Sequence, residues 1–146
     1  MLIWAFTWTH SKTSLAAEDH DHPHEGPNGG SLIGTGDEEY HAEILHDDKS
    51  NTVTIHLLDS KAKQAVPIES KEVAINVKGK GKPRQFKLKA MPIDKDPKGR
   101  SSRFLIKDKD LCSLLDDHNA QAWLRTSIAG KSFTGKIEHD HDHDHK

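Results

Sequence analysis

Short segments in which apolar and polar residues alternate are the feature that most constrains the fold of this chain. They lie at residues 40–45, 53–58, 73–77, 86–90, 103–106, 122–128 and 133–137. A period of two places successive side chains on opposite faces of a strand. Turn-forming clusters rich in Gly, Pro, Asp and Asn separate the segments, so the pattern predicts an all-β antiparallel domain. Short strands at this spacing are typical of a two-sheet sandwich, immunoglobulin-like in general architecture.

Residues 108–117 are the exception to this pattern. Asp108 is a suitable N-cap, and Leu111, Leu114 and Leu115 recur at a helical spacing. This segment therefore predicts one short helix. The single cysteine, Cys112, lies on it, and we expect a buried core residue there. One cysteine excludes an intramolecular disulfide and a Cys-rich zinc site.

The first two alternating segments predict a hairpin around the turn cluster at residues 47–51. In the favoured register His41 lies opposite His56, whereas a shift by two residues sets Glu43 opposite His56. Directly opposed side chains have Cβ atoms about 4.5–5.5 Å apart, which suits two ligands of one metal ion. We therefore name His41, Glu43 and His56 as metal-ligand candidates, with His46 at the strand end. The alternative is that they are ordinary residues of a solvated face.

Two histidine-acid runs, at residues 20–24 and 139–145, bracket the predicted domain and hold seven of the twelve histidines. Neutral imidazole is the commonest side-chain metal ligand, and carboxylates are secondary ligands. The runs therefore predict binding of a divalent transition metal (Zn, Cu or Ni), although a solvated tail without function is the alternative. The candidate ligands in the runs are His20, His22, His24, His139, His141, His143 and His145.

The ends of the chain differ in composition from its centre. Residues 1–17 are apolar at the front and end in small residues, so we interpret them as the remnant of a secretory signal. Residues 18–30 are a His/Gly/Pro-rich lead-in, residues 31–138 the sandwich domain, and residues 139–146 a tail that we expect to be disordered without metal. This organisation predicts a periplasmic or secreted protein. No segment is long enough to span a membrane as a helix, and a net charge of −2 does not favour nucleic acid as a partner.

One motif resembles a segment of known proteins. It begins His24-Glu25-Gly26-Pro27-Asn28-Gly29-Gly30-Ser31-Leu32 and continues, after Gly36, into Tyr40-His41-Ala42-Glu43. It is similar to the N-terminal His-Gly-Pro-x-Gly-Gly segment of periplasmic adaptor subunits of heavy-metal efflux pumps, and to small exported bacterial proteins with His-rich ends. Glu25 interrupts the adaptor form of the motif, and the chain lacks the helical hairpin of an adaptor. The resemblance implies a free-standing metal-binding domain, with a metal-efflux component as a partner.

Three functions follow from these observations. The first is an exported module that buffers or delivers a divalent transition metal. The second is a non-catalytic structural or interaction domain that its His-rich ends merely solvate. The third is a metal-dependent hydrolase, but the sequence has no nucleophile elbow and no recognisable catalytic spacing, so we do not expect an enzyme.

Overall fold

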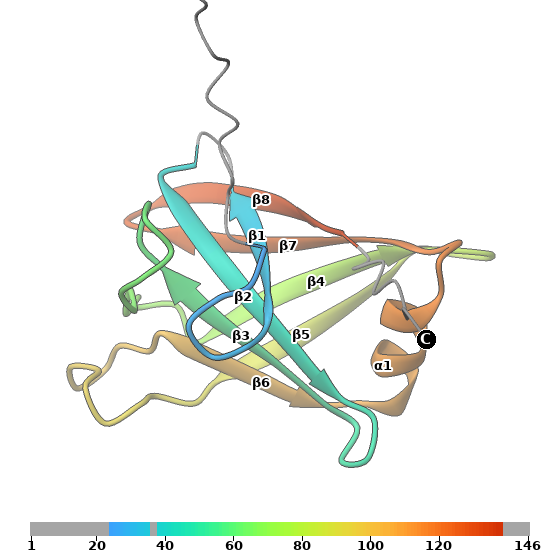
Figure 1. Cartoon of the computed structure of the whole chain (residues 1–146), viewed down its shortest axis with the longest axis horizontal. Coiled ribbons are helices and arrows are strands. Elements are labelled where there is room, and N and C mark those ends of the chain that lie inside the picture. Colours follow the sequence, from blue (N-terminus) through green and yellow to red (C-terminus); the bar gives the residue numbers. More distant parts are fainter. Residues whose placement is uncertain (1–23, 36–37, 139–146) are drawn as a thin grey trace, which may run out of the picture.

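The computed structural model describes residues 24–35 and 38–138, which form eight strands and one helix (Figure 1). All seven segments predicted as strands are strands, and the predicted helix is present. The first strand was not predicted. The strands are β1 (Ser31–Thr35), β2 (Tyr40–Asp47), β3 (Thr52–Leu58), β4 (Glu72–Lys78), β5 (Arg84–Ala90), β6 (Arg103–Lys107), β7 (Gln121–Ile128) and β8 (Lys131–Ile137), and the helix is α1 (Lys109–Asp116).

The strands form a single antiparallel sheet in the order β1-β2-β3-β6-β5-β4-β7-β8. The all-β prediction with one short helix is confirmed. The division into two sheets and the immunoglobulin-like arrangement are not, because a short ladder between β5 and β6 joins the two halves. Alternation specifies which face of a strand is apolar, but it does not specify which strands are neighbours.

The sheet curls until its two edge strands meet, as Figure 1 shows for β1 and β8. Gly135 of β8 makes this approach feasible. A Cβ atom on Gly135 would lie 2.6 Å from the Ile33 side chain and 2.7 Å from the Gly34 carbonyl oxygen of β1. The inward-facing residues of all eight strands then share one barrel-like core, which includes Val53, Ile55 and Leu124 at full burial.

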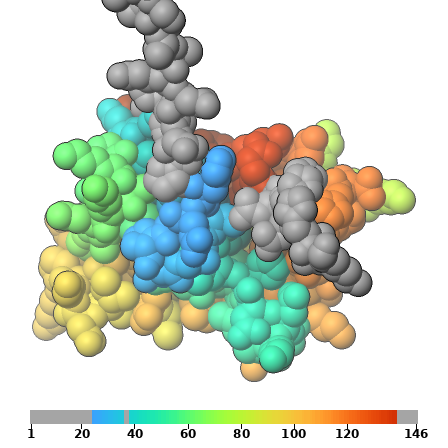
Figure 2. All heavy atoms as spheres, viewed as in Figure 1, coloured from blue at the N-terminus to red at the C-terminus, as the bar shows by residue number. Residues whose placement is uncertain are grey.

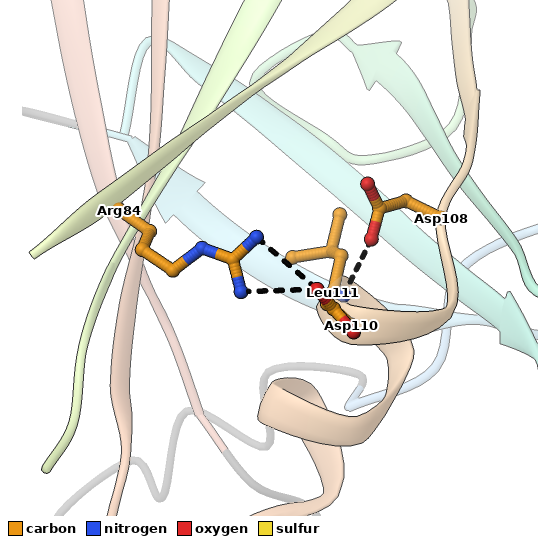
Figure 3. Close-up of polar contacts among 4 residues, drawn as sticks. All are labelled: Arg84, Asp108, Asp110 and Leu111. Atoms are coloured by element: carbon orange, nitrogen blue, oxygen red, sulfur yellow. Dashed lines mark hydrogen bonds and ion pairs between the residues drawn. The ribbon is translucent and has the colours of Figure 1, made fainter.

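The helix closes one end of the curled sheet (Figure 1). The Asp108 side chain accepts a hydrogen bond of 3.0 Å from the Leu111 amide, as predicted for the cap. Both terminal nitrogens of Arg84, on β5, lie 3.3 Å from one oxygen of Asp110 (Figure 3). Leu111, Cys112 and Leu115 face the core, so α1 packs by one apolar face.

The predicted β2–β3 hairpin is present, but the favoured register is wrong by two residues. Glu43 lies opposite His56, and His41 lies opposite Leu58. This is the second of the two registers considered. A shift by two residues leaves every side chain on the same face, so the apolar pattern cannot distinguish the registers. The turn between the two strands fixes the observed register. In it, Asp47 Oδ1 accepts a hydrogen bond from the Lys49 amide, and Asn51 adopts a φ of 54°.

Candidate metal site

A histidine and two aspartates converge where β2 ends beside α1. His46 is the penultimate residue of β2, Asp48 follows it in the turn, and Asp116 is the last residue of α1. His46 Nε2 lies 2.9 Å from Asp116 Oδ1. One ligand atom from each of the three residues lies within 4.8 Å of the others, and all three residues are exposed. We call these residues the His46 cluster.

The His46 cluster has the chemistry of a divalent cation site. One imidazole nitrogen and two carboxylates form a mixed N/O ligand set, which suits Zn²⁺, Cu²⁺ or Ni²⁺. Two carboxylates at this separation repel each other, and a cation between them would remove that repulsion. The side chains of His46 and Asp116 are 33% and 51% exposed, so an ion there would remain open to solvent and to incoming ligands.

A cleft of about 530 Å³ lies beside the cluster. His46 and Asp116 form part of its wall, together with His118 from the turn after α1. Gly30 from the lead-in and Glu138 from the end of β8 also line it. Segments far apart in the sequence therefore meet at one end of the sheet.

Glu43 has a different environment from the one expected of a metal ligand. Its side chain is fully buried on the outer face of β2 beneath residues 24–30. Glu43 Oε1 accepts hydrogen bonds of 2.8 Å from the amides of Asn28 and Gly30, and Oε2 accepts one of 2.8 Å from Asn28 Nδ2. We call this arrangement the carboxylate clamp. In it, Glu43 holds the Gly-Pro-Asn-Gly-Gly turn of the motif against the sheet.

Two glycines allow the turn to approach the carboxylate. A Cβ atom on Gly26 would lie 2.4 Å from Glu43 Cδ, and one on Gly30 would lie 2.5 Å from the Ile44 carbonyl oxygen. The segment lies at the surface beside the β2–β3 hairpin (Figure 2, blue and teal). Clamp formation therefore explains why Gly occupies both positions in this chain.

His41 and His56 lie on the same outer face as Glu43, as the observed register requires. His41 Nδ1 lies 3.2 Å from the Asp59 carbonyl oxygen. Burial lowers the pKa of His56 below its ordinary value, and Arg103 adds to this effect, whereas the Glu43 carboxylate opposes it. Among residues 24–35 and 38–138, no set of three ligand groups closer than 4.8 Å includes His41 or His56. Their role as a paired metal site stays a prediction.

The remaining predicted ligands are not gathered at the His46 cluster. His24 is exposed, and its carbonyl oxygen accepts a hydrogen bond from the Leu32 amide. The other ligands predicted in the two runs lie outside the described residues; they are His20, His22, His139, His141, His143 and His145.

Sequence reasoning had identified only one member of the His46 cluster, and only as an accessory ligand. The sequence pattern assigned Asp48 to a turn and Asp116 to the end of a helix. Asp116 lies 70 residues from His46 in the sequence. No local pattern connects them, because their proximity depends on where α1 docks on the sheet.

Comparisons with known proteins identify no relative. No protein-family model matches the sequence, and no curated protein or solved structure matches the chain significantly. Within the part of the chain that the structure describes, no helix is long and apolar enough to cross a membrane.

Proposed function

We propose that this chain is an exported metal-binding module that buffers or delivers a divalent transition metal. The observation that carries the proposal is the His46 cluster. In it, an imidazole from β2, a carboxylate from the turn after β2 and a carboxylate from α1 offer ligand atoms that lie within 4.8 Å of one another. The two histidine-acid runs support it independently, because they place seven further imidazoles in the same chain.

The position of the cluster favours binding over catalysis. Its ligands lie at the end of β2, in the turn that follows and at the end of α1, so the fold brings them together before the ion arrives. The site is exposed, which suits an ion that must enter and leave. A hydrolytic zinc centre needs fixed ligands within an enclosed, substrate-shaped pocket, and the cleft beside the cluster opens to solvent.

The chemistry of the ligands favours Zn²⁺, Cu²⁺ or Ni²⁺ over Cu⁺, which prefers sulfur. The only cysteine, Cys112, lies on the buried face of α1. Burial raises the pKa of its thiol, and the carboxylates of Asp48 and Asp116 add to this effect. A thiol with a raised pKa forms the metal-binding thiolate less readily, so Cys112 is a poor candidate ligand. A link to metal efflux and export to the periplasm rest on the motif and on the apolar first residues alone.

Metal titration in a background without the runs tests the proposal. In this background the seven run histidines are replaced by Asn, so that only sites on the fold remain. We expect one equivalent of Zn²⁺ or Ni²⁺ to bind by calorimetry, and His46→Ala to abolish it. The matched control is His41→Ala, which removes a histidine from the same strand but away from the cluster.

The outcomes separate the proposal from its alternative. Retention of the equivalent in His46→Ala would contradict a site at the cluster. Loss of the equivalent in His41→Ala but not in His46→Ala would move the site to the outer face of β2 and β3. A background protein that binds no metal would favour a non-catalytic structural or interaction domain with solvating His-rich ends.

A further inference from the structure

Trp123 lies on the outer face of the sheet, where β8, β7, β4 and β5 are neighbours. The residues before and after it on β7 are buried in the core, so its own side chain faces outward. The register aligns Trp123 with Lys136 of β8 on one side and with Asn76 of β4 on the other. Gln85 of β5 continues the row, and its Nε2 donates a hydrogen bond of 2.9 Å to Asn76 Oδ1. An aromatic ring and two amides therefore lie in one row across these strands.

Exposed cations surround this row. In the next row along the strands, Ala74 of β4 lies between Arg125 of β7 and Lys87 of β5. On the other side of the row, Lys78 is the last residue of β4 and lies on the same outer face. Arg125, Lys87 and Lys78 are exposed, as is Lys136 within the row itself. We call the surface formed by the row and these cations the Trp123 face.

The Trp123 face carries more positive than negative charge. Lys87 and Lys136 each have one exposed glutamate oxygen 3.5 Å away. Lys78 and Arg125 form no ion pair with any carboxylate in residues 24–35 and 38–138. The net charge of −2 is an average over the whole chain, whereas a ligand meets one face of it. This face therefore favours an anionic ligand, although the whole chain does not.

The depth of the tryptophan favours a ligand with a planar ring. Trp123 is half-buried, and the longer Lys and Arg side chains around it are exposed. A ring that stacks on Trp123 is then within reach of the cations, and a nucleic acid strand carries both planar bases and phosphates. We propose that the Trp123 face binds single-stranded nucleic acid, with a base stacked on Trp123 and neighbouring phosphates on Lys78 and Arg125.

Two other ligand classes fit this face less well. Aromatic anchors of a membrane surface insert at the level of the headgroups, whereas Trp123 is half-buried among longer side chains. A neutral glycan could stack on the ring, but it would make no use of the surrounding cations. The face shares no residue with the His46 cluster, so the inference does not depend on the proposed function.

The expected magnitudes follow from the two kinds of contact. Stacking of one base on an aromatic side chain, as measured by its loss, changes affinity by about 5- to 100-fold. For a single strand, the logarithm of the binding constant falls with the logarithm of the salt concentration by about 0.7 for each phosphate contact. Two to four contacts on the Trp123 face therefore give a slope of about −1.4 to −2.8.

The test measures binding of a fluorescein-labelled oligothymidylate of about ten nucleotides to the full chain by fluorescence anisotropy. A chelator removes metal, and a pH of about 8 keeps exposed imidazoles neutral. Trp123→Leu removes the ring, and Trp123→Phe keeps one. The double variant Lys78→Gln, Arg125→Gln removes two cations of the face. Its matched control, Lys63→Gln, Lys98→Gln, removes two exposed cations from loops elsewhere.

We expect Trp123→Leu to bind about 5- to 100-fold more weakly than the native chain and Trp123→Phe to stay close to it. The Lys78, Arg125 variant should reduce the salt slope by about 1.4, and the control should keep the native slope. This variant leaves the core intact, so the proposal is tested even where circular dichroism shows Trp123→Leu to be unfolded.

Three results would overturn the proposal. The first is no binding of the oligonucleotide at low salt. The second is native affinity in a folded Trp123→Leu variant, or an equal loss of slope in the control and in the Lys78, Arg125 variant. The third is tighter binding of a sulfated polysaccharide, or of phosphatidylserine vesicles, than of the oligonucleotide at the same salt concentration, which would reassign the face to that polyanion.

Discussion

Replacing Glu43 by Gln tests whether the carboxylate clamp stabilises the fold. The glutamine oxygen can still accept hydrogen bonds from the amides of Asn28 and Gly30. Its amide group then faces the Asn28 side chain, which must rotate to offer its own oxygen. The substitution therefore keeps the shape of the clamp and removes its charge.

The magnitude follows from the three bonds of the clamp. Hydrogen bonds to a charged group contribute about 1.5–3 kcal/mol each, and neutral ones about 0.5–1.5 kcal/mol. Loss of charge at three bonds costs about 3 kcal/mol, and the easier burial of a neutral amide offsets part of this. We expect Glu43→Gln to lower the free energy of unfolding by about 2 kcal/mol. Glu43→Ala should cost about 3–5 kcal/mol, because it also leaves the buried Gly30 amide without an acceptor.

Urea unfolding followed by circular dichroism measures these differences, and amide exchange at Gly30 reports on the clamp itself. The control is Glu72→Gln, which removes an exposed carboxylate 3.5 Å from Lys87 and should change stability by less than about 1 kcal/mol. The reasoning is refuted if Glu43→Gln unfolds within about 0.5 kcal/mol of the native chain and Gly30 exchanges at the native rate.

Four further results are expected. A chelator should leave the circular dichroism of the β strands unchanged, since the described core contains no histidine; loss of the signal would show that the fold needs metal. The free energy of unfolding should fall as the pH drops below about 6.5, because the pKa of His56 is lower in the folded state and the unfolded state therefore binds the proton at a higher pH. His56→Gln should flatten this part of the pH profile of stability. An unchanged slope would show that His56 does not cause the pH dependence. Gly135→Ala should lower the melting temperature strongly by forcing β8 away from β1, whereas Gly34→Ala, whose Cβ meets nothing within 4 Å, should not. Asp108→Ala should cost about 1 kcal/mol in urea unfolding through loss of the α1 cap, and a neutral effect would contradict the capping role.

The elements of this fold were predictable because their signals are local. Alternation identified seven strands, and the Asp108 cap with its apolar spacing identified α1. The first strand escaped because Ser31–Thr35 is short and contains Gly34, so it offers little alternation.

Features that depend on contacts between elements were not predictable in the same way. The β2–β3 register depended on turn geometry, and the single sheet depended on a short β5–β6 ladder. The His46 cluster depended on the docking of α1, which brings Asp116 to His46. The motif at the lead-in was visible, but its physical role became apparent only when Glu43 was found buried beneath it.

The carboxylate clamp also has a consequence for the conditions in which this fold can assemble. It joins residues 15 apart in the sequence, Asn28 and Glu43, and so cross-links the lead-in to the sheet without a covalent bond. A disulfide closing a loop of that length would stabilise by about 3 kcal/mol, but it requires an oxidant and fails under reduction. The sequence has a single cysteine, which is buried, so an intramolecular disulfide cannot form in this chain. The clamp needs neither oxidant nor isomerase, so the N-terminal histidine-acid run keeps a fixed point of attachment in oxidising and reducing surroundings alike.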